Sequence, residues 1–162
     1  VGSARDNLAG SVALDCGASP GGWTKYLAEE VRCRAIYSVD PAELSGDVLG
    51  MDRVHHLRTR IEDAIGDLRR DGTQIGLWVS DMCLFNMSGQ IDTLLEARAS
   101  GLLRDGCFFV LTLKCVRGRT KASFDSQVEK EVKRLDGIVT GVEVFHLFSN
   151  RSGERTVMGF MI

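Results

Sequence analysis

The chain has 162 residues, a net charge of −2, 44% hydrophobic residues and 26% charged residues. This length holds one domain with one sizeable core, and the balance is that of a soluble globular protein. No apolar run reaches the roughly 18 residues of a membrane span, and the start of the chain lacks the apolar segment of a signal peptide. We therefore expect a soluble protein with no membrane partner, in the cytoplasm or, in a eukaryote, the nucleus.

The five cysteines form no CxxC pair, and their number is odd. Most of them stand in apolar surroundings. This pattern favours reduced core thiols over a disulfide framework, and we expect no metal site.

In chain order, short apolar runs alternate with segments of helical periodicity. The first expected helix follows a glycine-rich turn and carries Trp23, Tyr26, Leu27 and Val31 on one face. Further helices are expected at 61–68, along an apolar stripe from Ile91 to Leu103, and along another from Phe124 to Leu135. The expected strands are 11–15, 35–39, 53–57, 75–80, 107–113, 142–148 and 155–162.

This alternation predicts an α/β fold with a parallel sheet that helices cover on both faces. The last two strands are joined by only about six residues, SNRSGE, whereas a parallel crossover needs roughly a dozen or more. The final strand must therefore run antiparallel to its predecessor. We expect one Rossmann-like domain over residues 1–162, with a mostly parallel seven-stranded sheet and an antiparallel C-terminal hairpin.

The first strand runs into a glycine-rich turn, LDCGASPGGW, at residues 14–23. Ligands of open parallel sheets bind beyond the carboxyl ends of the strands, where glycines allow close approach of a backbone. Ser19 occupies the place of the second glycine in the dinucleotide motif GxGxxG, which disfavours an oxidoreductase. A purely structural turn is the alternative interpretation.

The nine-residue pattern DxGxxPGGW resembles the first motif of the FtsJ-like family, the heat-shock ribosomal RNA 2′-O-methyltransferases. The resemblance covers roughly residues 11–162 and implies a Rossmann-like methyltransferase domain that binds S-adenosylmethionine. In the family this turn holds the methionine part of the cofactor. The implied cofactor residues are Asp15, Gly17, Ala18, Ser19, Pro20, Gly21, Gly22 and Trp23.

The adenosine part of the cofactor is expected at the ends of the next two strands. Asp40 ends the second strand, where a carboxylate can accept hydrogen bonds from ribose hydroxyls, although a capping role is the alternative. At the third strand end the family often places an acid against the adenine amino group. This chain has Arg60 there, and Glu62 or Asp63 could substitute for the acid.

Three polar residues match the last three members of the family's catalytic Lys-Asp-Lys-Glu tetrad. Asp81 lies in SDMCLFNMSG, which resembles the family's SDMxxNxSG with one residue more, and Asp81 also borders the cofactor. Lys114 ends an apolar strand, and Glu154 opens the last strand. The alternatives are an end cap, a lysine that extends to water and a turn glutamate. Lys114 is the candidate base, provided that burial or a neighbouring cation lowers its pKa.

The segment KCVRGRTK, from Lys114 to Lys121, carries four cations and no acid. It leaves the sheet on the ligand side, so we interpret it as a phosphate-facing patch, although a solvated loop is the alternative. The segment LFSNRSGERTV is similar to that of the bacterial enzymes that 2′-O-methylate a cytidine of large-subunit ribosomal RNA. The resemblance implies an RNA partner, with ribosomal RNA favoured over transfer RNA or messenger RNA caps. The candidate RNA-binding residues are Arg117, Arg119, Lys121, Asn150 and Arg151.

The first lysine of the tetrad has no counterpart among the ten residues before the first expected strand. We therefore expect either a fragment of a longer chain or an incomplete active site with low activity. Two other interpretations remain open: a module that binds cofactor or RNA without turnover, and a methyltransferase for a small molecule or a protein. Neither of them needs the full set of Asp81, Lys114 and Glu154.

Overall fold

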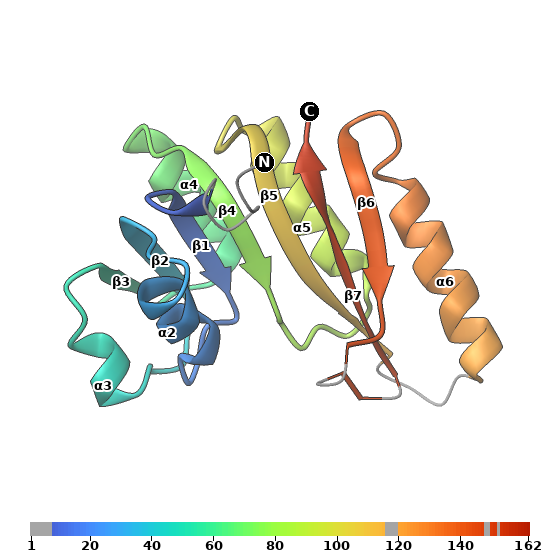
Figure 1. The fold of residues 1–162 in the computed structure, drawn as a ribbon, viewed down its shortest axis with the longest axis horizontal. Coiled ribbons are helices and arrows are strands. Elements are labelled where there is room, and N and C mark those ends of the chain that lie inside the picture. The colour runs from blue at the N-terminus through green and yellow to red at the C-terminus, as the bar shows by residue number, and fades with distance from the viewer. Residues whose placement is uncertain (1–7, 116–119, 148–149, 152) are drawn as a thin grey trace.

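The computed structural model describes residues 8–115, 120–147, 150–151 and 153–162. Seven strands form one sheet in the order β3-β2-β1-β4-β5-β7-β6, as Figure 1 shows. The strands are β1 (Val12–Cys16), β2 (Ala35–Val39), β3 (Val54–Leu57), β4 (Ile75–Ser80), β5 (Leu103–Lys114), β6 (Val139–Phe145) and β7 (Glu154–Met161). The helices are α2 (Gly22–Glu29), α3 (Gly46–Leu49), α4 (Ile61–Arg70), α5 (Ser88–Ala99) and α6 (Lys121–Lys133).

The first five strands are parallel, and β7 runs antiparallel to both β5 and β6. The expected mostly parallel sheet with an antiparallel C-terminal hairpin is therefore confirmed. Because β1 to β5 are parallel, their carboxyl ends meet at one edge of the sheet. The antiparallel pairing brings the start of β7 to the same edge, where Glu154 stands opposite Lys114.

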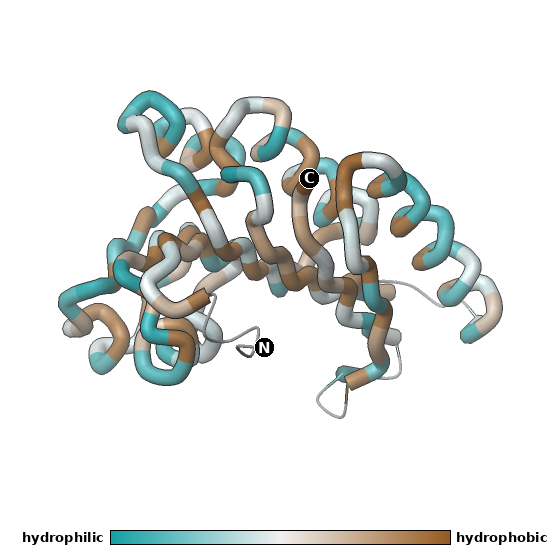
Figure 2. The backbone as a smooth tube through the Cα atoms, turned by 45° about the horizontal axis from the view of Figure 1, so that its top comes forward, coloured by the Kyte–Doolittle hydropathy of each residue, from teal (hydrophilic) through white to brown (hydrophobic). Residues whose placement is uncertain are grey.

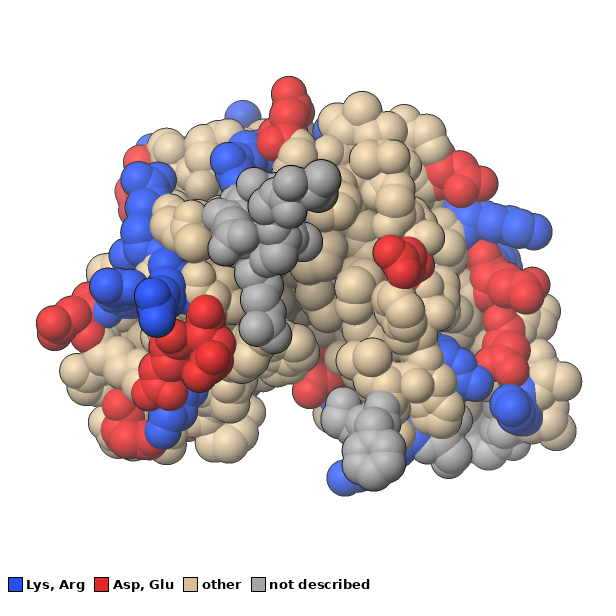
Figure 3. Space-filling view, in the orientation of Figure 1, with Lys and Arg blue, Asp and Glu red and all other residues tan. Residues whose placement is uncertain are grey.

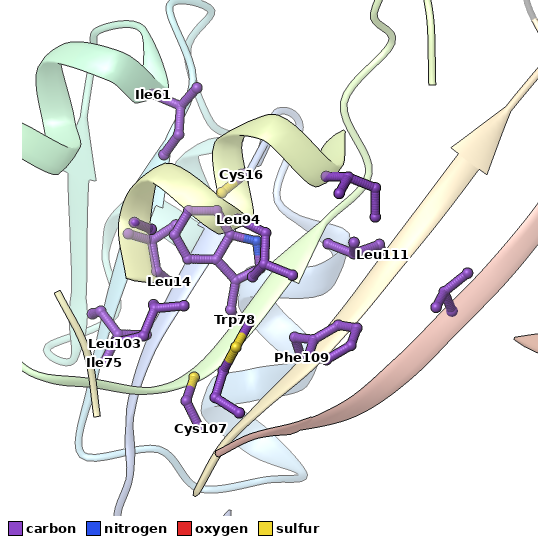
Figure 4. Packing of buried hydrophobic residues seen from close by; sticks show 14 of the residues in the cluster. Leu14, Cys16, Ile61, Ile75, Trp78, Leu94, Leu103, Cys107, Phe109 and Leu111 are labelled. Carbon is purple, nitrogen blue, oxygen red and sulfur yellow. The ribbon is translucent and has the colours of Figure 1, made fainter. Parts of the chain in front are cut away.

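Helices lie on both faces of the sheet. Side chains of α4, α5 and α6 share one hydrophobic cluster with β1, β4, β5 and β7, while Leu27 of α2 packs on the opposite face with Ala13 and Val79. Figure 2 shows the apolar central strands between more polar outer segments. In Figure 4, Leu94 of α5 lies against Trp78, with Phe109 and Leu111 of β5 beside them. All four of these side chains are fully buried.

The expected end of α5, the expected start of β5 and the expected range of β6 were wrong. Helix α5 ends at Ala99, Gly101 turns the chain with φ 79, and Leu103 begins β5 instead of extending the helix. The apolar stripe continued because Leu102 and Leu103 are buried as the chain enters the sheet. Strand β6 lies at Val139–Phe145, three residues before the expected range, and the short helix α3 was not anticipated.

None of the five cysteines, which all lie in the described residues, forms a disulfide, and three of them, Cys16, Cys33 and Cys107, are buried. Cys83 is exposed, in contrast to the apolar setting expected for most of the thiols. Within the described ranges, no group of three histidine, cysteine or acidic side chains is placed to hold a metal ion. No described helix is both long and apolar enough to span a membrane.

Candidate functional site

Strand alternation sends the polar strand-end residues toward one face of the sheet. Successive side chains of a strand point to opposite faces, and Val79 and Val110 belong to the cluster under α2. Asp81 and Lys114 follow these two residues at even spacing, so they continue the same face beyond the end of the packed cluster. Glu154 pairs with Lys114 across the β5–β7 ladder. The fold thus gathers the three tetrad candidates at one corner of the carboxyl edge.

Lys114 and Asp81 form the central ion pair of this corner. Lys114 Nζ lies 2.9 Å from Asp81 Oδ1, and the two side chains are 19% and 39% exposed. The ammonium also donates to the backbone oxygen of Asp81 at 3.0 Å and to Cys83 Sγ at 3.4 Å. These contacts anchor the lysine to the β4–α5 connection, while the pair remains open to a ligand.

The pKa of Lys114 is raised above its ordinary value. Burial by itself lowers this pKa, but the hydrogen bond and charge of Asp81, together with the contact to Cys83, raise it by more. The condition for Lys114 to act as a base, a lowered pKa, is therefore not met in this state of the protein. The reason is that Asp81 supplies a close opposite charge. Lys114 is a cation at neutral pH.

Glu154 is held in the turn that precedes β7. Its Oε2 accepts the Arg151 backbone N–H at 2.9 Å. Asn150 Oδ1 accepts the Leu147 N–H at 2.8 Å and the Thr156 hydroxyl at 3.1 Å, so its side-chain oxygen is already engaged within the turn. Arg151 is exposed. Of these residues, Arg151 is the one that presents an uncommitted side chain toward solvent in the described geometry.

Among the remaining RNA-binding candidates, Lys121 is the one that the structure describes. Lys121 is the first residue of α6 and is exposed, and the Thr120 side chain caps the helix by accepting the Ser123 N–H. Arg117 and Arg119 lie outside the described residues.

Two glycines shape the turn after β1. Gly17 has φ 76, and a Cβ there would lie 3.0 Å from Met82 Cγ. Gly21 has φ 123, and a Cβ there would lie 2.9 Å from Val48 Cγ2. Residues that carry a side chain rarely adopt either of these backbone conformations. The glycines therefore let the turn pack against the β4–α5 connection on one side and against α3 on the other.

We expect Gly21→Ala to lower the free energy of unfolding by about 1–3 kcal/mol, because alanine would be strained at this φ and crowded by Val48. Gly22→Ala is the matched control. Gly22 is the first residue of α2, a Cβ there would meet nothing within 4 Å, and alanine is favoured in a helix. Denaturant titration compares the two. Equal stability of both variants would contradict the constraint at Gly21.

Asp40 fixes the turn against the end of β2. Its Oδ2 accepts the Ser19 N–H at 3.0 Å, and its Oδ1 accepts the Ala42 N–H at 2.8 Å. Ser19 also donates its hydroxyl to the Glu43 backbone oxygen at 3.0 Å. Each carboxylate oxygen has a second lone pair for a ligand hydroxyl. Asp40 thus combines the capping contacts with a position on the wall of a cavity.

This cavity of about 300 Å³ opens at the ends of β1 to β4. Among the expected cofactor residues, Gly17 and Asp40 line it, together with Arg60 and Glu62. Asp63 is not on this wall and accepts the Thr59 hydroxyl at 3.4 Å instead. Sequence reasoning did not assign the other lining residues to the cofactor, because mostly apolar side chains carry no chemical signal of a binding role even where, as at Met82, they lie in a quoted motif: Val39, Pro41, Thr59, Ile61, Met82, Cys83 and Leu84.

Asp15 is a fully buried carboxylate beneath the turn. Its Oδ2 accepts the Thr24 hydroxyl at 2.7 Å, whereas its Oδ1 has no hydrogen-bond partner. Burial raises the Asp15 pKa to about 6, with smaller contributions from Asp81 and Asp40. Asp15 does not line the cavity, so its unpaired oxygen lies beneath the turn and not on the cavity wall.

Other members of the turn are committed to packing. Ala18 is buried in a cluster with Leu44 and Val48 of the α3 region. Trp23 packs against the α2-side cluster and makes an edge contact with Tyr26, with the ring centroids 6.1 Å apart. Neither these residues nor Ser19, Pro20, Gly21 and Gly22 line the cavity.

Comparison with known proteins places the chain in a family. The profile of the FtsJ-like methyltransferases matches residues 3–149. The chain belongs to the FtsJ-like methyltransferase family. It is also 25% identical, over 92% of its length, to an uncharacterized protein of Methanocaldococcus jannaschii, and it spans 39% of that relative.

Solved structures share the fold of this FtsJ-like chain. The pre-rRNA processing protein fibrillarin of Methanococcus jannaschii superposes with a TM-score of 0.70, 11% identity and coverage of 93% of this chain and 66% of that one. Human methyltransferase-like protein 13 in complex with SAH gives 0.69, 13% identity and coverage of 98% and 76%. At these identities the likeness concerns the fold, which confirms the Rossmann-like methyltransferase architecture.

S-adenosylmethionine is the cofactor of this FtsJ-like methyltransferase. The residues present fit it. The cavity of about 300 Å³ lies at the lower end of the usual range for small-molecule sites. Asp40 offers acceptors at one side, and the unpaired Asp15 Oδ1 is an acceptor near the glycine turn.

Proposed function

We propose that the chain is an RNA 2′-O-ribose methyltransferase domain, with ribosomal RNA as the favoured substrate. The observation that carries the proposal is the Lys114–Asp81 ion pair of 2.9 Å, with Glu154 as the register partner of Lys114. Cys83 contacts the Lys114 ammonium and also lines the cavity, so the pair adjoins the cofactor site. The order Asp, Lys, Glu matches the family's RNA-modifying tetrad.

Two further features support an RNA substrate. The exposed Lys121 and Arg151 stand on the elements that flank Lys114 and Glu154, where phosphate groups of a bound strand would be attracted. The fold is shared with fibrillarin, which is described as a pre-rRNA processing protein. We assign Lys121 and Arg151 to RNA contacts, and Gly17 and Asp40 on the cavity wall, with Asp15 beneath the turn, to the cofactor.

S-adenosylmethionine supplies an activated methyl group when it is bound. The chain has to align the ribose 2′-hydroxyl and stabilise negative charge on its oxygen. Alignment of two reactants lowers the activation barrier by roughly 7–11 kcal/mol. Proton removal by a general base typically raises the rate by about 10²–10⁴-fold. The charged Lys114 suits alignment and charge stabilisation, because its ammonium would donate a hydrogen bond to the 2′-oxygen. The proton of the 2′-hydroxyl would then be released to water. Asp81 orients the ammonium, and Glu154 bounds the site from β7.

An assay of methyl transfer to RNA tests this proposal. The chain is incubated with radiolabelled S-adenosylmethionine and total RNA, and the RNA is then digested and its nucleosides are separated. We expect label in 2′-O-methylated nucleosides, mainly from the ribosomal fraction. Label in transfer RNA or in capped messenger RNA would assign a different RNA as the substrate. Label in a base would contradict ribose methylation.

A second candidate function is a module that binds the cofactor or RNA without turnover. Arg60 favours it, because a guanidinium on the cavity wall cannot accept a hydrogen bond from the adenine amino group. Calorimetric binding of S-adenosylmethionine without any transfer to RNA would select this alternative.

A further inference from the structure

The connection between β4 and α5 presents one aromatic ring to solvent. Phe85 is 93% exposed, whereas the next most exposed large hydrophobic residue among the described ones is the C-terminal Ile162 at 56%. Single exposed apolar residues are common on protein surfaces, but an almost fully exposed phenylalanine forgoes roughly 1.5–3 kcal/mol of burial. The ring is therefore fully accessible to a ligand.

The neighbours of Phe85 are anchored on both sides. A Cβ on Gly89 would lie 2.8 Å from Leu84 Cδ1, so Leu84 packs on the first turn of α5. Asn86 Oδ1 accepts the Gly89 N–H at 3.0 Å, and Met87 is buried. The backbone around Phe85 is thus held in place, while its ring projects outward. Such a ring loses little freedom when it binds.

The same connection builds both parts of the proposed site. Asp81 begins it and pairs with Lys114, and the Cys83 thiol contacts the Lys114 ammonium at 3.4 Å. Cys83 and Leu84 line the cofactor cavity. Phe85 directly follows these two residues in the chain, so it is part of the same β4–α5 connection that carries Asp81.

We propose that the Phe85 ring stacks on a nucleobase of the RNA strand whose ribose is methylated. The inference rests on the proposed function. Aromatic side chains bind bases of single strands by stacking, and this contact is tolerant of sequence. A protein partner would need about 800 Å² of contact surface, whereas Phe85 is a single exposed ring between the half-buried Leu84 and the polar Asn86. On the face of the molecule that Figure 3 shows, charged side chains gather over α2 and α3, whereas the surface over β5 and β7 is largely uncharged.

Binding of a single-stranded mixed-sequence RNA 20-mer, followed by fluorescence anisotropy, tests the stack. Phe85→Ala should bind about 5- to 150-fold more weakly, which corresponds to ~1–3 kcal/mol. The slope of affinity against salt concentration should not change, because no phosphate contact is lost. Phe85→Tyr should bind like the wild type, and Phe85→Leu should resemble the alanine variant. Phe160→Ala removes a ring at the far end of β7 and should leave RNA affinity unchanged.

The methylation assay separates the two proposals. Phe85→Ala should raise the KM for total RNA, with the S-adenosylmethionine affinity unchanged in calorimetry. Wild-type affinity in Phe85→Ala, or in Phe85→Leu, would overturn the stack while RNA methylation by the parent chain still stands. A parent chain that neither binds nor methylates RNA would overturn the proposed function itself.

Discussion

Replacing Lys114 with alanine should slow methyl transfer by about 10²–10⁴-fold and leave S-adenosylmethionine affinity nearly unchanged. The ammonium is paired with Asp81 at the corner where β5 meets β7, and Lys114 is not part of the cavity wall. Single-turnover rates measure the first quantity and calorimetry the second. Normal turnover, or lost cofactor binding, would contradict the assignment.

The matched control is Lys130→Ala, on the last turn of α6, where the lysine is exposed and lies outside the proposed site. The Lys114 variant should unfold at a similar denaturant concentration to the wild type, since its partner Asp81 is 39% exposed and is not left as a buried charge. A large loss of stability would mean that the slow transfer reflects misfolding.

The charge of Lys114 distinguishes two roles. The pKa of Lys114 is above its ordinary value, so a base would make the rate rise steadily with pH across the neutral range. A cation that holds the 2′-oxygen gives a rate that is independent of the Lys114 proton in that range. Lys114→Arg keeps the positive charge and cannot lose it. Partial activity of the arginine variant with a flat pH profile is the result we expect.

Asp15→Asn should become progressively more stable relative to the wild type as pH rises. The Asp15 pKa is about 6 in the folded chain against an ordinary value of 3.8. The folded state therefore disfavours the charged carboxylate, at full cost above pH 6, and this cost disappears as pH falls toward 4. The stability difference between variant and wild type should grow by roughly 3 kcal/mol between pH 4 and pH 8.

The absolute stability of Asp15→Asn is set by two opposing terms. The amide oxygen can still accept the Thr24 hydroxyl, but the new NH₂ group takes the place of the unpaired oxygen, which costs about 1–3 kcal/mol. Denaturant titrations at pH 4 and pH 8 measure the change. Asp52→Asn, at an exposed turn, is the control for the same exchange of side chain outside the core. A difference that stays constant for Asp15→Asn would contradict the buried charge.

The same variant tests the cofactor role of Asp15. The Asp15 carboxylate lies in the core next to the glycine turn, although its charge lowers the free energy of unfolding above pH 6. We expect Asp15→Asn to weaken S-adenosylmethionine binding at pH 8, in line with a trade between stability and function. Unchanged affinity would show that Asp15 only supports Thr24 and α2.

The sequence by itself determined the elements and the edge of the sheet on which the site lies. The apolar runs mark the strands, and the short connection before Glu154 forces the last strand to run antiparallel. Each polar candidate stands at a strand end, so strand direction alone sends Asp40, Asp81, Lys114 and Glu154 to the carboxyl edge. These features are local in the chain, and for that reason they can be read from it.

Only the tertiary structure decided which of these groups meet. The strand order brings β4 beside β5, so Lys114 pairs with Asp81, and this pairing raises the lysine pKa above its ordinary value. It also showed that Asp40 already binds two backbone amides and that Phe85 faces solvent. Periodicity fixes the face of a side chain within its own strand. Distances between strand ends depend on the order of strands in the sheet, and hydrophobic spacing does not encode that order.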